Sequence, residues 1–238
     1  MNCVMIRKMM RILLLIVLSI PATALAQEEI NQTDSDGLRH GTWKKYYPGT
    51  QQLRYQGTFE HGQEVGEFRF YCEECGDQPS VIKKFESGSD LAEVTYYTIK
   101  GQLVSRGNMR GKQRVGEWVY YHKGREQVMT REFYEAGVLH GLKTTYYPDG
   151  TVTEEINYVN GKKEGPNKFY SPEGQLLKDL NHSNDELHGP ATYYDAQGGP
   201  VIKGSYKAGK KDGLWTYYAE GQLVSEERFP KPRKKKGQ

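Results

Sequence analysis

One tyrosine recurs through this chain at intervals of 24 or 25 residues, and this spacing constrains the fold more than any other feature. It is the fifth residue after the start of each of eight successive copies: Tyr46, Tyr71, Tyr96, Tyr121, Tyr146, Tyr170, Tyr194 and Tyr218. Seven copies start at glycine, and the degenerate third copy starts at Leu91. Self-similarity at a fixed short period is the signature of a repeat architecture.

Each copy contains the parts of a β-hairpin. A run ending in the tyrosine is followed by a glycine-bearing turn, such as Pro148-Asp149-Gly150, and then by a second short run. Most glycines fall on equivalent positions of the repeat, where turns with positive φ exclude a β-carbon. Sequential pairing of these strands predicts an all-β fold: an elongated single-layer antiparallel β-meander of about eight 24–25-residue β-hairpin repeats. Because such a sheet has no second layer, columns of cross-strand side-chain pairs must stabilise it, at about 0.2–1 kcal/mol each.

The first 26 residues have the layout of a secretory signal peptide. Three bases precede an apolar run over residues 12–20, and Ala24-Leu25-Ala26 forms a small-residue cleavage site. We therefore expect cleavage after Ala26 and a secreted or periplasmic protein. The apolar run is shorter than the roughly 20 residues that span a bilayer, so no transmembrane segment is expected after maturation.

The charge of the remaining chain limits its partners. The full sequence has 33 Lys and Arg against 30 Asp and Glu, and removing three bases with residues 1–26 makes the mature chain neutral. This excludes a nucleic-acid binder that relies on overall positive charge. We expect a loose polar lead-in at 27–37, the repeat array at 38–229 and a basic disordered tail at 230–238. The tail either contacts cell-wall polymer or another anionic surface, or is only a solubilising end.

The two cysteines beyond residue 26 are Cys72 and Cys75, in a turn of the second repeat. An oxidising compartment favours a disulfide between them. The alternatives are a redox Cys-x-x-Cys, which needs a helix N-terminus, and a zinc site, which needs two further ligands. Neither requirement is met by the surrounding sequence.

The histidines do not predict a shared site. His40, His140 and His188 each precede a repeat-start glycine, so their spacing along the sheet is about 19 Å and about 38 Å. Paired carboxylates such as Glu154 and Glu155 are adjacent and point to opposite faces of a strand. We therefore expect no metal, no cofactor and no catalytic group, and the sequence predicts a protein that is not an enzyme.

Aromatic residues at the second position of the repeat are the candidate binding residues: Trp43, Phe68, Trp118 and Trp215. Packing within the sheet is one interpretation. The other is an exposed aromatic face, because a one-layer sheet must expose part of one side, and Tyr and Trp suit extended protein or glycan binding.

The unit Gly-x-Trp-x-x-Tyr-Tyr-x-x-x-Gly-x-Leu…Tyr-x-x-Gly-Lys-x-x-Gly resembles the MORN-repeat variant family, whose name derives from the membrane-occupation-and-recognition nexus. Lys162 and Lys163 after Gly161, and Lys210 and Lys211 after Gly209, fit that pattern, and the resemblance covers residues 38–229. It implies twisted β-hairpin arrays that contact proteins or lipids, and bacterial members are often labelled antitoxins. The predicted function is an extended protein-binding scaffold without catalytic activity; the alternatives are an antitoxin-type neutralising module and a cell-wall or glycan binder.

Overall fold

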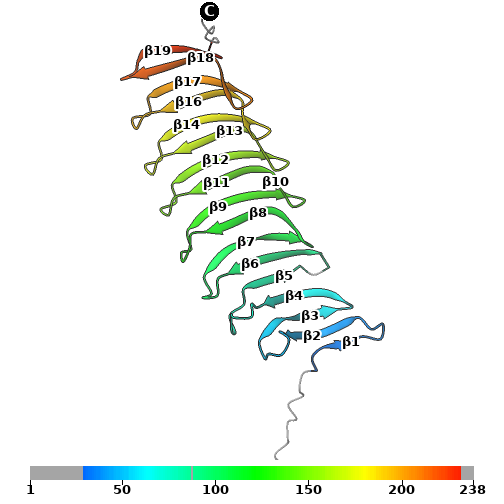
Figure 1. The fold of residues 1–238 in the computed structure, drawn as a ribbon. Coiled ribbons are helices and arrows are strands. Elements are labelled where there is room, and N and C mark those ends of the chain that lie inside the picture. The colour runs from blue at the N-terminus through cyan, green and yellow to red at the C-terminus, as the bar shows by residue number, and fades with distance from the viewer. Residues whose placement is uncertain (1–28, 87, 232–238) are drawn as a thin grey trace, which may run out of the picture.

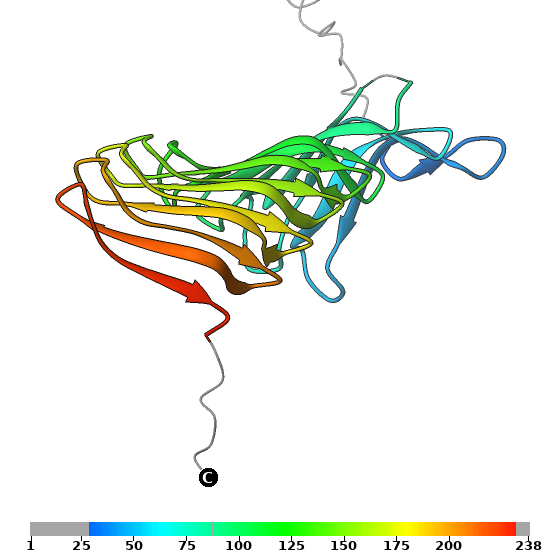
Figure 2. The ribbon, with the colours of Figure 1, turned by 90° about the horizontal axis from the view of Figure 1, so that it is seen from above.

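Every long strand of this protein pairs with the strand that follows it in sequence. The computed structural model describes residues 29–86 and 88–231, so the predicted signal peptide and most of the basic tail lie outside the described residues. The described residues form 19 antiparallel strands in one open sheet and no helix, which confirms the predicted all-β meander (Figure 1). The strands stack like rungs, and the sheet twists along its length, as β-sheets do (Figure 2).

The strands of the first four repeats are β1 (Gln32–Thr33), β2 (Arg39–Tyr46), β3 (Leu53–Glu60), β4 (Gln63–Phe70), β5 (Val81–Phe85), β6 (Leu91–Tyr97), β7 (Leu103–Arg110), β8 (Gln113–Tyr121) and β9 (Val128–Glu135). The later strands are β10 (Val138–Leu139), β11 (Gly141–Tyr146), β12 (Val152–Val159), β13 (Lys162–Tyr170), β14 (Leu176–Ser183), β15 (Glu186–Leu187), β16 (Gly189–Tyr194), β17 (Pro200–Lys207), β18 (Lys210–Ala219) and β19 (Gln222–Phe229).

Three of these strands have only two residues, and the other sixteen are the two strands predicted for each repeat. β10 and β11 are the two halves of one interrupted strand, separated at His140, and β15 and β16 are separated in the same way at His188. The third short strand, β1, lies within the predicted lead-in and pairs with β2. The prediction of a loose lead-in is therefore wrong, because its backbone joins the sheet.

The turns along one side of the sheet have a common backbone. Ala136 and Gly137 have φ of 47° and 84°, and Asn160 and Gly161 have 51° and 81°. Positive φ at both central residues is what a two-residue type I′ hairpin requires, and this turn matches the twist of its strands. The pattern keeps successive hairpins in the same orientation.

The strand register moves the third copy by one residue. Ala92 pairs with Met109 as Gly116 pairs with Tyr134, so the copy starts at Ala92. Its lattice tyrosine is Tyr97, which follows the same register shift as Tyr121, and the assignment to Tyr96 is wrong. The third copy thus starts 26 residues after Gly66 and 24 residues before Gly116, one position later than the 25-residue period predicts.

Large rings lie flat on glycines of the preceding strand and form the core. A β-carbon added to Gly57, Gly107 or Gly204 would lie 2.2–2.5 Å from the ring of Phe68, Trp118 or Trp215, respectively. The two tryptophan rings centre separate apolar clusters, one with Ala92 and Val94 and the other with Leu180 and Ala191. We call the side of the sheet that carries these rings the tryptophan face, and the other side the opposite face.

Candidate functional site

Three of the four aromatic candidates are not exposed. Phe68 and Trp118 are 0 % exposed, Trp215 is 1 % exposed, and only Trp43 is partly accessible. The expected exposed aromatic face is therefore wrong at Phe68, Trp118 and Trp215. The physical reason is that a glycine backbone lies below each of these rings and side chains of neighbouring strands surround them.

Basic side chains cover the tryptophan rings from above. The Arg114 guanidinium lies 4.5 Å from the Trp118 ring centroid and donates hydrogen bonds to the hydroxyls of Tyr120, at 2.6 Å, and Tyr134, at 3.1 Å. Burial, with a hydrogen bond to Tyr134, raises the pKa of Tyr120. Cations over aromatic rings contribute about 0.5–1 kcal/mol at exposed sites and more when desolvated. These bases stabilise the sheet and close its aromatic surface.

The other two tryptophans have equivalent caps. Lys211 lies 4.2 Å from the Trp215 ring and donates a 3.0 Å hydrogen bond to the hydroxyl of Tyr217. Arg39 lies 5.4 Å from the Trp43 ring. Each cap stands four residues before its ring, so this basic residue is part of the repeat's packing.

The middle of the tryptophan face is polar. Lys143 occupies the ring position of its repeat and forms a 3.0 Å ion pair with Glu132, which also accepts a 2.7 Å hydrogen bond from Tyr134. Asn167 takes the same position in the next repeat, is 2 % exposed and donates to a carboxylate oxygen of Glu154. A satisfied polar network thus separates the two apolar clusters.

The hydrogen-bond partners of Glu132 and Lys143 shift the pKa values of both groups. Burial disfavours the charged form of Glu132, but hydrogen bonds from Tyr134 and Lys143 outweigh burial and lower the pKa of Glu132. Burial likewise opposes the charge of Lys143, yet its hydrogen bond to Glu132 raises the pKa of Lys143. Both groups are therefore charged at neutral pH, and the pair acts as a structural ion pair.

His182 lies at the edge of the polar network. Its Nδ1 atom is buried and makes no hydrogen bond to the described residues. Burial, and then the nearby charge of Lys163, lowers the pKa of His182. The ring is consequently neutral at pH 7.

Hydroxyl groups tie successive repeats together at the lattice tyrosines. Tyr47 donates to the carbonyl of Tyr71, at 2.9 Å, and Tyr147 donates to the carbonyl of Tyr170, at 3.2 Å. Tyr71 is buried, whereas Tyr46, at the N-terminal end, is exposed. The residue after each of Tyr46 and Tyr146 thus links one turn to the next.

The opposite face exposes apolar side chains near the centre of the array. Phe133 is 41 % exposed, Leu142 is 44 % exposed, and Met129 and Val104 are exposed as well. These side chains come from the neighbouring strands β7, β9 and β11, on the same face as the buried Val119. The 2.8 Å ion pair between Arg131 and Glu117 lies among them. Exposed aromatic, Met and Arg side chains that lie together are typical of protein-binding surfaces.

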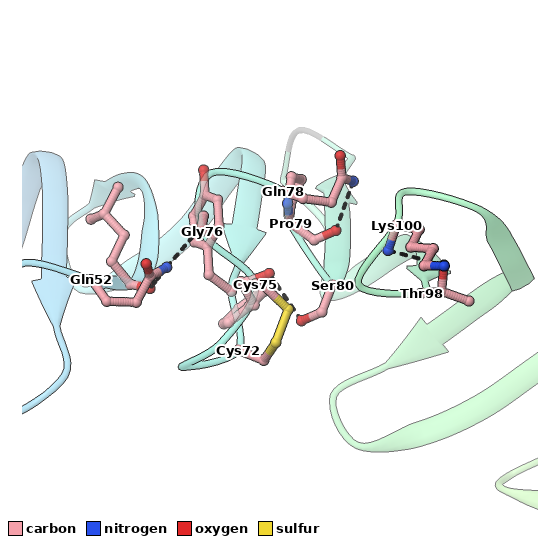
Figure 3. Close-up of a disulfide and its surroundings, with 12 residues drawn as sticks. Gln52, Cys72, Cys75, Gly76, Gln78, Pro79, Ser80, Thr98 and Lys100 are labelled. Carbon is pink, nitrogen blue, oxygen red and sulfur yellow. Dashed lines mark hydrogen bonds between the residues drawn. A yellow bond between two sulfur atoms is a disulfide. The ribbon is translucent and has the colours of Figure 1, made fainter.

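The loop between β4 and β5 contains both cysteines (Figure 3). Cys72 and Cys75 are joined in a disulfide, and Cys75 is buried. Gln52, from the neighbouring turn, donates a 2.7 Å hydrogen bond to the carbonyl of Gly76. This loop covers residues 71–80 and is longer than the turns beside it, so the disulfide shortens its free span.

One group of potential metal ligands occurs in the described part of the chain. Ligand atoms of Asp34, His40 and His61 all lie within 4.8 Å of one another. Asp34 follows β1, His40 lies in β2, and His61 lies in the turn between β3 and β4. Backbone hydrogen bonding from Leu38 lowers the pKa of Asp34, so its carboxylate is ionised at neutral pH.

Sequence reasoning missed this group because it compared only histidines that precede a repeat-start glycine. His61 occupies a different position, the first residue of a hairpin turn, where the other repeats have residues such as Ala136, Asn160 and Ala208. Superposing the turns of the repeats identifies the substitution. His140, in contrast, lies 3.8 Å from Glu135 and has Asn160 beside it.

Comparison with protein families agrees with the register of the repeats. A model described as the MORN repeat variant matches residues 139–160 and 163–184, two consecutive repeats in the polar middle. Residues 139–184 are therefore two repeats of the MORN repeat variant type. MORN repeats are modules that bind proteins or membranes, and a search of curated proteins finds no match to the chain. Within the described residues, no helix is long and apolar enough to cross a membrane.

Proposed function

We propose that this chain is an exported scaffold without catalytic activity, and that it binds a protein partner through the opposite face. The MORN-repeat fold supports a binding role. The observation that carries the proposal is the exposed apolar surface of Val104, Met129, Phe133 and Leu142. The tryptophan face is a poorer surface because its rings are already covered.

Geometry favours a flat or extended partner. β7, β8, β9 and β11 are successive neighbours in the sheet, about 4.8 Å apart, so the four side chains span about 14 Å across the strands. Aromatic, Met and Arg side chains are enriched in protein interfaces, and the Arg131–Glu117 pair supplies a polar contact between Met129 and Phe133. Export rests on the signal-peptide pattern of residues 1–26.

Photo-crosslinking in living cells tests the surface directly. A photoreactive phenylalanine analogue placed at Phe133 should give one specific protein adduct, and Leu142→Ser in the same chain should remove it. Leu214, 43 % exposed in β18 at the position of its repeat that Leu142 takes in its own, is the matched control position and should give no such adduct. Unfolding midpoints of all variants verify that the sheet is intact.

Two results would contradict the proposal. One is the absence of any protein adduct at Phe133 in a correctly folded chain. The other is an adduct that forms equally well at the Leu214 position. Binding of the purified chain to peptidoglycan, unaffected by Leu142→Ser, would instead support the cell-wall alternative.

A further inference from the structure

We infer that Asp34, His40 and His61 form a binding site for a divalent first-row transition-metal ion, with Zn²⁺ as the probe. Two imidazoles and one carboxylate are a donor set that such ions accept, and the group leaves coordination positions open to solvent. The three ligand atoms lie within 4.8 Å of one another, against about 3.3 Å between ligands of a tetrahedral zinc ion with bonds of about 2.05 Å. Small side-chain rotations close that difference.

The carboxylate is already oriented. One oxygen of Asp34 accepts hydrogen bonds from the backbone of Asp36, at 3.0 Å, and of Leu38, at 2.9 Å. The second oxygen lies 2.8 Å from Nδ1 of His61. The Asp34 side chain is only 10 % exposed, so its position is set by the turn and not by solvent.

The two imidazoles are held by the sheet. His40 lies in β2, and the turn that carries His61 is fixed to β2 by a 2.8 Å hydrogen bond from the Gly62 amide to the Arg39 carbonyl. The ring centroids of His40 and His61 are 5.2 Å apart. Both histidines are exposed, which gives an ion direct access.

Comparison between the repeats shows that the turn does not need a histidine. His61 has a φ of 45°, and the equivalent Ala136, Asn160 and Ala208 have φ of 47°, 51° and 50°. The turn thus forms with Ala or Asn at this position and does not require an imidazole, so the His61 ring is available as a ligand beside His40 and Asp34.

The His140 repeat is an internal control. It has His140 in the position of His40 and Glu135 at 3.8 Å, but Asn160 in the position of His61. Among the described residues, this repeat does not form a three-ligand group. The complete site and this incomplete copy differ in two ligands: Asn160 stands in place of His61, and Glu135, with a 77 % exposed side chain, stands in place of the 10 % exposed Asp34.

Calorimetric titration of the metal-free mature chain with Zn²⁺ tests the site. We expect one ion per chain, and His61→Asn should weaken binding more than about 10-fold, since loss of even an outer-shell partner costs 10–100-fold. His61→Asn copies the sequence of the His140 repeat, so the turn should keep its backbone. Asn160→His should create a second site.

Hydrogen exchange supplies a readout that is independent of affinity. A bound ion joins the segment after β1 to β2 and to the β3–β4 turn, so Zn²⁺ should slow exchange of the Asn31 amide, which bonds to the carbonyl of Thr42. His61→Asn should abolish that protection. Stoichiometry and affinity unchanged in both His61→Asn and Asp34→Asn would overturn the assignment, as would zinc binding without added protection at Asn31.

Discussion

Gly204→Ala is the sharpest test of how the core is built. In the structure, the added β-carbon would lie 2.2 Å from Cδ2 and 2.3 Å from Cε2 of the Trp215 ring. Carbon atoms in contact are separated by about 3.5 Å, so the ring or the strand must move by about 1.3 Å. Gly204 does not have a positive φ, so the expected effect comes from the ring and not from backbone strain.

The cost of this movement is estimated from the contacts that it disturbs. Inserting a methyl group into a packed core costs about 1–3 kcal/mol. Displacing the ring also weakens the 3.1 Å hydrogen bond from its indole nitrogen to the Ser205 carbonyl, worth about 0.5–1.5 kcal/mol. We therefore expect Gly204→Ala to lower the free energy of unfolding of the C-terminal repeats by about 2–4 kcal/mol.

Tryptophan fluorescence and hydrogen exchange during urea unfolding measure the effect, because repeat arrays do not always unfold as one unit. Gly199→Ala is the control: its β-carbon would meet the carboxylate of Asp195, which backbone hydrogen bonds hold in the β16–β17 turn, so any shift stays in that turn and away from the Trp215 ring. In a Trp215→Leu background, Gly204→Ala should cost much less, since the ring that it displaces is gone. A Gly204→Ala variant as stable as wild type, or a cost that persists without the ring, would refute the packing argument.

Two further predictions follow from charge and from export. The pKa of Glu132 is lowered in the folded state, so its stabilising contribution is present above its unfolded pKa of about 4.3 and is lost as the pH falls through the folded pKa. Glu132→Gln should therefore make the unfolding midpoint less sensitive to acid between pH 6 and pH 3. The control Glu173→Gln, in an exposed turn, should not have this effect. The mature protein recovered from the cell envelope should start at Gln27 by mass spectrometry, and an intact Met1 terminus would contradict export by cleavage.

The fold was predictable because its signal is repeated. Each copy contains the same glycine turns and alternating strands, so a strand that is ambiguous in one copy can be assigned from the equivalent strands of the others. The prediction failed where a copy departs from the period. The third copy lacks a start glycine and begins one residue late, and only the pairing of Ala92 with Met109 reveals that Tyr97 takes the lattice position. The lead-in failed for another reason, since two residues of β1 are too few to give a strand pattern.

The candidate site was less predictable because it depends on which side chains cover one another. A ring at the second position has the same local pattern whether it is exposed or buried. The contact between Asp34, His40 and His61 joins two turns and a strand, and no spacing within a single repeat predicts it. A single turn position with an unusual residue was the only available signal.

Burial of the rings nevertheless has a sequence rule, which becomes clear from the packing. Each buried ring lies eleven residues after a glycine: Gly57 and Phe68, Gly107 and Trp118, Gly204 and Trp215. Two other repeats fill the same pair of positions with complementary groups: a small side chain against a large one in Ala191 and Leu180, and opposite charges in Lys143 and Glu132.

Trp43 has no glycine eleven residues before it, and, as this rule predicts, its ring is not fully buried. Eleven residues before it stands Gln32, which has a side chain and belongs to the two-residue edge strand β1. The ring donates a 2.9 Å hydrogen bond to the Gln32 carbonyl but remains partly exposed, because no glycine surface receives it. The N-terminal end of the array therefore lacks the ring-on-glycine packing that stabilises the β3–β4, β7–β8 and β17–β18 pairs. The Asp34–His40–His61 group connects β1, β2 and the β3–β4 turn at this same end.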